Sequence, residues 1–272
     1  MSTTTTAPAP VAAASRSGGP VRLLRHSAVL AKRNLIGVTR NPEALLDVTL
    51  QPVLFLAMFT YIFGGAVAHG SQHDYLQFLL PGVLAQLVAF AGASIGVNLN
   101  TDIEKGVFDR FRSLPIARAA PLLGAVLADV VRYTLLCVVT VGFGYVLGFR
   151  AHTNAPEVLA ACLVVIAFAL CLSWFSVLVG MLARTPGSVQ GIVIMAMFPL
   201  TFGTSTLVPA STLPGWLQSF ADVNPLTHLV GTTRALMLGG PVRSDLLWTF
   251  VWMAILLVVL VPLALRAYRR RA

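Results

Sequence analysis

The sequence predicts an all-α integral membrane protein with six transmembrane helices, and three observations support this fold class. First, 57% of the 272 residues are hydrophobic and only 11% are charged, with a mean hydropathy of +0.81, whereas a soluble domain carries about 25% charged residues. Second, most Lys and Arg residues lie between the long apolar segments rather than within them. Third, six segments reach the roughly 20 apolar residues that a spanning helix needs: Leu45–Val67, Leu76–Leu99, Pro121–Leu147, Val158–Ala183, Val189–Val208 and Leu246–Leu265.

The distribution of the basic residues predicts the orientation of the chain. When the N-terminus is placed inside, most of the 19 Lys and Arg residues fall in inner segments, and the outer segments hold Arg150, Arg234 and Arg243. An excess of Lys and Arg marks the cytoplasmic side, so we expect a multi-pass protein of the plasma membrane with both termini in the cytoplasm. The basic residues are spread over four segments instead of one face. The net charge of +9 therefore does not indicate a nucleic-acid partner.

The first 40 residues divide into two parts. Residues 1–20 are rich in Thr, Ala, Pro and Ser and lack the apolar core of a signal peptide, so we expect a disordered cytoplasmic tail. From Val21 to Arg40 apolar residues recur at helical spacing opposite a basic face. This pattern predicts a helix that lies in the membrane interface and is drawn to anionic lipid. An ordinary solvated basic helix is the alternative.

A dense charged cluster lies between the second and third predicted spans, on the cytoplasmic side. Thr101 and Glu104 have the spacing of a capping box, which predicts that a helix starts here, and Pro115 stops it. Apolar and charged residues alternate along this segment at helical spacing. We therefore expect a helix over Asp102–Leu114, about 20 Å long, which can carry force from a soluble motor into the spans. A solvated loop helix that only enforces topology is the alternative.

The stretch between the fifth and sixth predicted spans is apolar but broken. Leu213–Ala221 is long enough for a short helix. Asn224 suits an N-cap and proline suits the first helical position, which predicts a second helix over Pro225–Leu238, stopped by Gly239. This helix is about 21 Å long, shorter than the roughly 30 Å hydrocarbon core. We expect it to dip in from the outer face and return, and a surface loop on the outer leaflet is the alternative.

The sequence contains no P-loop for ATP. That motif requires Gly-Lys followed by Ser or Thr, because the lysine reaches the nucleotide phosphates. The two lysines of this chain, Lys32 and Lys105, follow an alanine and a glutamate. We therefore expect no cofactor in this chain. ATP-driven work must come from a separate subunit that holds ATP and magnesium.

Asp129 and Arg132 are ionisable residues within the third predicted span, and such residues are functional hypotheses by default. They are three residues apart, so they are neighbours on one helix surface. Two interpretations stay open. The pair either neutralises itself, or it forms an interhelical contact that changes as the protein opens. No metal site is expected, because His69 and His73 have only Asp74 as a nearby acidic partner.

Several motifs together resemble one known family. The stretch Asp102-x-Glu-Lys-Gly-Val-x-Asp-Arg-x-Arg-Ser-Leu-Pro-Ile-Ala-Arg118, followed by Ala128-Asp129-x-x-Arg132, is similar to the permeases of type-2 ABC exporters, in particular to the daunorubicin-resistance branch. The motifs Asn224-Pro225-Leu226-Thr227 and Arg234-Ala235-Leu236 fit the same family. The resemblance covers nearly the whole chain, from Arg22 to Arg271.

The resemblance implies that residues 21–272 form one type-2 ABC transmembrane domain. It implies that Val21–Arg40 is an interfacial helix, that Leu213–Leu238 is an outer re-entrant pair, and that Asp102–Leu114 is a coupling helix that docks in a cleft of a partner ATPase. The working unit is then a pair of permeases, either two copies or one copy with a sister permease, on a pair of ATPases in the lipid bilayer. The residues expected to couple to the ATPase are Glu104, Lys105, Gly106, Phe108, Asp109, Arg110, Phe111 and Arg112, and those of the re-entrant region are Asn224, Pro225 and Arg234.

Three functions follow from these patterns. The leading one is the permease subunit of an ATP-driven exporter of hydrophobic or amphipathic compounds, such as a drug, an antibiotic or a lipid. A permease of the same architecture that exports a polysaccharide or another polymer is the second, although mainly aliphatic spans favour an apolar cargo. The third is an intramembrane enzyme. It is the weakest, because no predicted span holds a His or a Glu.

Overall fold

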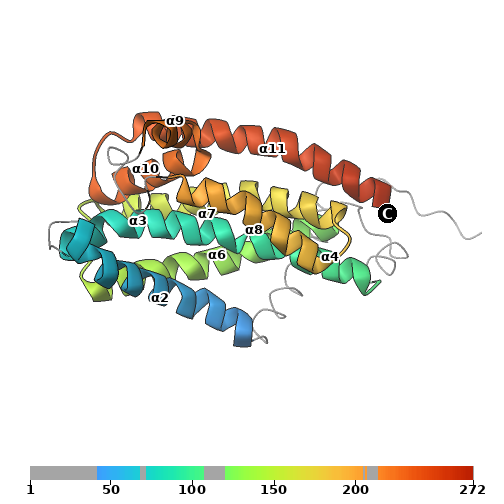
Figure 1. The fold of residues 1–272 in the computed structure, drawn as a ribbon, viewed down its shortest axis with the longest axis horizontal. Helices are drawn as coiled ribbons and strands as arrows, with labels where there is room; N and C mark the ends of the chain where they lie inside the picture. The colour runs from blue at the N-terminus through green and yellow to red at the C-terminus, as the bar shows by residue number, and fades with distance from the viewer. Residues whose placement is uncertain (1–41, 68–71, 107–119, 205, 207–213, 272) are drawn as a thin grey trace, which may run out of the picture.

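The computed structural model describes residues 42–67, 72–106, 120–204, 206 and 214–271, and every regular element within them is helical. Figure 1 shows long helices side by side in an elongated bundle, with α9 and α10 gathered at one end and the C-terminus at the other. The predicted all-α class is therefore confirmed. The helices are α2 (Pro42–Val67), α3 (Gln72–Ala91), α4 (Ala93–Glu104), α6 (Ala120–Leu147), α7 (Ala155–Leu182), α8 (Pro186–Phe202), α9 (Gly215–Val223), α10 (Pro225–Leu238) and α11 (Arg243–Arg271).

Within the described ranges, four helical segments are long and apolar enough to cross a membrane. The second predicted span is longer than expected, at 33 residues, because α4 follows α3 after an interruption at Gly92. Two shorter apolar helices, Thr49–Gly64 and Pro186–Phe202, fall in the first and fifth predicted spans. The exact count of six spans therefore stays a prediction. The four long segments are Gln72–Glu104, Asp129–Leu147, Ala155–Leu182 and Arg243–Arg270.

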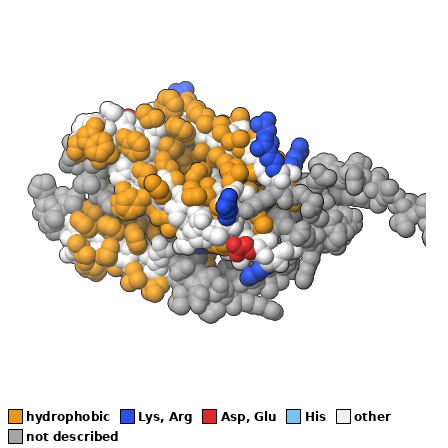
Figure 2. Space-filling view, turned by 45° about the vertical axis from the view of Figure 1, so that its right-hand side comes forward, with side chains coloured by type: hydrophobic (Ala, Val, Ile, Leu, Met, Phe, Trp, Pro, Cys, Tyr) orange, Lys and Arg blue, Asp and Glu red, His pale blue; other side chains and the backbone are white. Residues whose placement is uncertain are grey.

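α3 lies at the centre of the bundle. Nearly all of its side chains from Tyr75 to Ala91 are buried, and it contacts α2, α6, α7 and α10. By contrast, α2, α8 and α11 turn large apolar side chains outward, such as Leu54, Met195 and Val258, and hydrophobic side chains cover most of the face in Figure 2. An apolar surface of this extent is typical of a protein covered by lipid or by another subunit.

Charged side chains gather at the end of the bundle where α4, α7 and α11 finish. In Figure 2 most of the visible Lys and Arg side chains, with an acidic one among them, lie on the right-hand side of the apolar face. We call this region the charged end; α9 and α10 lie at the opposite end (Figure 1). Its exposed, described residues are Glu104, Lys105, Arg184, Arg266, Arg269 and Arg270.

The helix predicted over Pro225–Leu238 is confirmed, with the same bounds, as α10. Asn224 caps it, because its side-chain oxygen accepts a hydrogen bond from the α10 backbone at 2.9 Å. Gly239 follows the last turn with a φ of 88°, a left-handed conformation that glycine adopts readily. The preceding helix, predicted over Leu213–Ala221, is described over Gly215–Val223. It ends two residues later than predicted, since the Asn224 amide still donates to the carbonyls of its last turn.

The capping box predicted at Thr101 and Glu104 is wrong. Both residues belong to the last turns of α4, and the Thr101 hydroxyl donates a hydrogen bond to the carbonyl of Val97 at 2.9 Å instead of capping a new helix. α4 ends at Glu104, and Gly106 has a φ of 67°. α4 already begins at Ala93. The Ser/Thr-x-x-Glu spacing at Thr101 therefore lies at the end of a helix here, not at its start. The predicted helix over 102–114 therefore does not begin at Asp102.

Candidate functional site

Asp129 and Arg132 lie one turn apart on α6 and contact the beginning of α4. Asp129 is 9% exposed, and the positive charge of Arg132 acts on its carboxyl group. The Arg132 guanidinium also donates a hydrogen bond to the Ser94 hydroxyl of α4, and the Tyr133 hydroxyl donates to Asp129 at 3.4 Å. The charge of Arg132 therefore acts on Asp129 within α6, while its guanidinium bonds across to α4. A change of this contact during function stays a prediction.

The interruption between α3 and α4 lies beside this cluster. A Cβ atom on Gly92 would lie 3.1 Å from the Tyr133 hydroxyl oxygen and 3.5 Å from the Cβ of Ser173 on α7. The first of these distances is shorter than ordinary van der Waals contact. A larger residue at this position would push α6 away, so glycine lets three helices meet where the long second span is interrupted.

α4 and α7 pack closely along a seam of small residues. A Cβ atom on Gly180 would lie 2.6 Å from the carbonyl oxygen of Gly96, and one on Gly96 would overlap the Ser176 carbonyl. The Ser176 hydroxyl accepts a hydrogen bond from the Gly96 amide at 3.0 Å and donates to the Ala93 carbonyl at 2.7 Å. Small residues allow helix backbones to approach inside membranes, and hydroxyl groups bond across the contact.

Asn100 closes the seam at the charged end. It is 1% exposed, and its side-chain amide donates to the carbonyls of Gly180 at 2.9 Å and Ala183 at 3.0 Å. α7 ends at Leu182 and Ala183 is its C-cap, so both accepting carbonyls lie at the end of this helix. Asn100 of α4 therefore caps the end of α7. Our sequence reasoning missed this residue, because the second predicted span ends at Leu99 and no local spacing connects Asn100 to its partners on α7.

The structure describes three of the residues predicted to couple to an ATPase. Glu104 and Lys105 are exposed at the charged end, and Gly106 is partly buried beside them. Asn100 lies about one turn before Glu104 on α4, so the seam begins directly inside the charged end. The other predicted coupling residues, together with the tail 1–20 and the helix Val21–Arg40, lie outside the described residues: Phe108, Asp109, Arg110, Phe111 and Arg112.

The residues predicted for the outer region all lie at α10, but they serve separate contacts. Besides capping α10, Asn224 donates through its side-chain nitrogen to the carbonyls of Leu200 at 2.8 Å and Gly203 at 3.3 Å, so it binds the end of α8. Pro225 occupies the first turn of α10. Arg234 lies near the other end of the helix, almost three turns away. The structure therefore does not bring these residues together into one site.

Arg234 packs α10 against α3. Its guanidinium carbon lies 3.9 Å from the centroid of the Phe78 ring, and it donates a hydrogen bond to the Phe78 carbonyl at 3.2 Å. A cation over an aromatic face is attracted to it. Burial lowers the pKa of Arg234 to about 10, and the charge of Asp245 opposes this shift. Arg234 therefore remains a cation at neutral pH.

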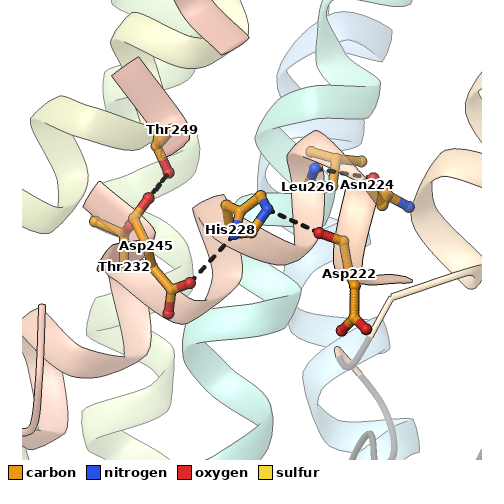
Figure 3. A network of polar contacts seen from close by, with 7 residues as sticks. All are labelled: Asp222, Asn224, Leu226, His228, Thr232, Asp245 and Thr249. Carbon is orange, nitrogen blue, oxygen red and sulfur yellow. Dashed lines mark hydrogen bonds and ion pairs between the residues drawn. The ribbon is translucent and has the colours of Figure 1, made fainter. Parts of the chain in front are cut away.

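A polar network joins α9, α10 and α11 at the same end of the bundle (Figure 3). His228 Nδ1 lies 3.2 Å from an Asp245 carboxylate oxygen, and Nε2 lies 3.1 Å from the Asp222 carbonyl oxygen. The hydroxyls of Thr232 and Thr249 are 3.1 Å apart. Sequence reasoning missed His228, because its partner is 17 residues away on another helix and no local spacing marks the pair. In the part of the chain that the structure describes, no three His, Cys, Asp or Glu residues lie close enough to hold a metal ion.

These features define a helical membrane protein. Polar contacts join its helices at both ends of the bundle, and charged side chains are concentrated at the charged end. The family model for the ABC-2 type transporter matches residues 26–238, and the chain belongs to this family. It is a multi-pass membrane permease subunit, a transport component rather than an enzyme. The resemblance noted in the sequence is thus confirmed.

Named relatives agree with this assignment. The chain is 41% identical to the daunorubicin resistance ABC transporter permease protein DrrB1 of Streptomyces coeruleorubidus, over 93% of this chain and 89% of that protein. It is 28% identical to the probable doxorubicin resistance ABC transporter permease protein DrrC of Mycobacterium tuberculosis, over 85% and 83%. The putative transport permease ycf38 of Cyanophora paradoxa is 29% identical over 76% and 72%.

Proposed function

We propose that this chain is the membrane subunit of an ATP-driven exporter of hydrophobic or amphipathic compounds, powered by a separate ATPase. The observation that carries the proposal is the 41% identity to a permease named for daunorubicin resistance, which extends over 93% of the chain. Two features support it. The sequence offers no P-loop of its own, and the spans are mainly aliphatic, which suits an apolar cargo.

The charged end is the cytoplasmic end in this proposal, because Lys and Arg accumulate on that side of a membrane. Both chain termini then lie in the cytoplasm of the cell. Six crossings are made by α2, by α3 with α4, and by α6, α7, α8 and α11. α9 and α10 form the outer re-entrant pair. The short length of α10, about 21 Å, and the hydrogen bonds from Asn224 to the end of α8 support this placement, since a helix that does not span needs partners for its polar ends.

The partner ATPase, which holds ATP and magnesium, docks at the charged end on the segment 102–114. Exposed Glu104 and Lys105 provide the first charges of that surface. Such charges set register and suppress wrong partners more than they add affinity. The aromatic residues of the segment, Phe108 and Phe111, are the expected apolar anchors.

A second permease subunit packs along α8. One face of this helix is open, and Cβ atoms on Gly187 or Gly191 would meet nothing within 4 Å. Glycines four residues apart allow a close helix–helix contact in a membrane. Disulfide cross-linking of the Gly191→Cys variant tests this arrangement. Cross-linked pairs of this chain indicate two copies, whereas a cross-link only to another permease indicates a sister subunit.

Reconstitution of the chain with its ATPase in lipid vesicles tests the proposed function. We expect ATP-dependent accumulation of daunorubicin in inverted vesicles, and no accumulation when the ATPase carries a substitution of its P-loop lysine. The purified chain alone should hydrolyse no ATP. Drug-independent hydrolysis without accumulation, or accumulation with the disabled ATPase, would contradict the proposal.

A further inference from the structure

We propose that His228 and Asp245 form a pH-sensitive clamp, which holds α9, α10 and α11 together when the imidazole ring is protonated and loosens when it is not. The clamp lies at the end of the bundle opposite the charged end (Figure 1). This inference rests on the proposed function, in which that end faces the outer medium. The pH of the outer medium then sets how firmly the three helices are joined.

Both ring nitrogens of His228 face an oxygen that accepts hydrogen bonds. Nδ1 lies 3.2 Å from a carboxylate oxygen of Asp245, and Nε2 lies 3.1 Å from the backbone carbonyl oxygen of Asp222 (Figure 3). A neutral imidazole carries one N–H group, whereas the imidazolium carries two. Only the imidazolium can therefore donate to both oxygens at once. In the neutral ring one nitrogen turns a lone pair toward an oxygen, and this repulsion does not depend on the other partners of the two oxygens.

The position of Asp245 favours a negative charge beside the ring. Asp245 lies in the first turn of α11, where the helix dipole stabilises an acidic side chain, and the charge of Arg234 on α10 also acts on it. A Cβ atom on Gly231 would overlap the Asp245 carboxylate. Glycine at this position thus lets the carboxylate lie against α10, about one turn after His228. An anion placed there stabilises the imidazolium relative to the neutral ring.

Trp248 of α11 covers one face of the His228 ring. The two ring centroids are 5.8 Å apart and the ring planes differ by 19°, and a cation over an indole face is attracted to it. The side chain of His228 is 15% exposed and that of Asp245 is 38% exposed. The pair is therefore partly shielded but still reaches water, which a proton needs in order to enter and leave.

The other charged groups of the described helices that pack against α10 leave this contact to Asp245. The Asp222 carboxylate points away from the ring (Figure 3), and α8 carries no titratable side chain over Pro186–Phe202. At this end of α3, α7 and α11, the remaining titratable side chains, none of them bonded to His228, are His73, Asp74, Tyr75, Glu157 and Arg243.

The clamp should act in the range where histidine changes its charge. An ordinary histidine does so between about pH 5 and pH 8. Because the bound ring holds the extra proton, the stabilisation is present at the acidic side of this range and is lost as the pH rises. The outer ends of α9, α10 and α11 are therefore held together in an acidic medium and released in an alkaline one.

Hydrogen exchange of the full-length chain in lipid nanodiscs tests the clamp without the ATPase. The measurement is the protection of the amides of α9 and of the first turns of α11, corrected for the intrinsic effect of pH. Between about pH 5.5 and about pH 8.5 we expect this protection to fall about fivefold, the size that a partly exposed ion pair allows. In His228→Gln and in Asp245→Asn the protection at acidic pH should equal the alkaline value.

Thr249→Val is the matched control. The hydroxyls of Thr232 and Thr249, 3.1 Å apart, join the same two helices as the clamp, but they do not titrate. This variant should lower the protection at both pH values by a similar factor, so that the ratio between them stays that of the parent.

Drug-stimulated ATP hydrolysis by the complete complex in inverted vesicles tests the consequence for transport. The outer end then faces the vesicle lumen, so the lumenal pH is varied while the medium around the ATPase is kept constant. We expect slower hydrolysis at acidic lumenal pH in the parent and no dependence on lumenal pH in His228→Gln. Hydrolysis is measured instead of accumulation, because a pH gradient by itself redistributes a basic drug.

Each outcome decides a separate part of the inference. Equal protection of α9 at both pH values in the parent, or a pH dependence that persists in His228→Gln, would overturn the clamp. Hydrolysis by the parent that ignores the lumenal pH would overturn its role in transport. A parent complex that fails to accumulate drug with ATP would instead contradict the proposed function, since the exchange measurement does not need the ATPase.

Discussion

Removal of the Arg132 side chain should destabilise the protein more than removal of Arg132 and Asp129 together. In the Arg132→Met variant the buried Asp129 carboxyl group loses its cationic neighbour, and Ser94 loses a hydrogen bond. Breaking a close, buried ion pair from one side typically costs 3–5 kcal/mol. Arg132 is only half-buried and acts on Asp129 through its charge rather than in a close ion pair, so we expect a smaller loss, about 2 kcal/mol.

The double variant Asp129→Asn/Arg132→Met removes both charges and should cost about 1 kcal/mol, because no uncompensated charge remains. Equilibrium unfolding in detergent micelles, followed by circular dichroism, measures both values. Ser94→Ala tests the contact across to α4, although it also removes the hydrogen bond from Ser94 to the Ala91 carbonyl at 3.0 Å. Combining it with Arg132→Met isolates the contact, because a combined loss smaller than the sum of the two single losses shows that Ser94 and Arg132 interact. If the single and double variants unfold at the same denaturant concentration, Asp129 and Arg132 are not coupled and the reasoning fails.

The remaining predictions concern other contacts of the described helices and the proposed docking segment. Gly180→Ala forces a Cβ atom against the Gly96 carbonyl and should lower the free energy of unfolding by about 1–3 kcal/mol. The measurement is the midpoint of thermal unfolding, which should fall. Gly142→Ala serves as the control, because its Cβ atom would meet nothing within 4 Å. Asn224→Ala should cost about 1 kcal/mol or more through the lost cap, and Asn224→Asp should recover the cap but not the bonds to the end of α8. The double variant Phe108→Ala/Phe111→Ala should weaken co-purification with the ATPase by about 2 kcal/mol or more while membrane insertion stays normal; assembly and transport like the parent would exclude the docking role.

The parts of the fold that local chemistry decides were predictable from the sequence. α10 has the predicted bounds because Asn224, the proline after it and Gly239 each act within a few residues of their own position. The long apolar helices were predictable for a similar reason. A run of aliphatic residues is costly to expose to water wherever it lies, so segment length and hydropathy suffice to find the helices.

Local patterns failed where the same spacing suits two structures. The spacing of Thr101 and Glu104 is typical of a helix start. In the structure, however, the Thr101 hydroxyl donates to the carbonyl four residues earlier, a hydrogen bond that a threonine inside a helix can also make. The seam between α4 and α7 was out of reach for another reason. Asn100 and Gly180 are 80 residues apart, and nothing in either segment specifies the other.

The contacts of α7 connect the charged end of the bundle to its opposite end. α7 has 28 residues, about 42 Å as a helix, and it is bonded to other helices at both ends. Asn100 holds one end. Just before the other end, the Thr153 hydroxyl donates to the Leu236 carbonyl at 2.6 Å and the His152 amide donates to the Met237 carbonyl at 3.0 Å, both at the end of α10. A rigid helix held in this way cannot shift along its axis without moving α10 or breaking these bonds. Because His228 binds α10 to α11 and to the end of α9, these three helices are expected to respond as a group.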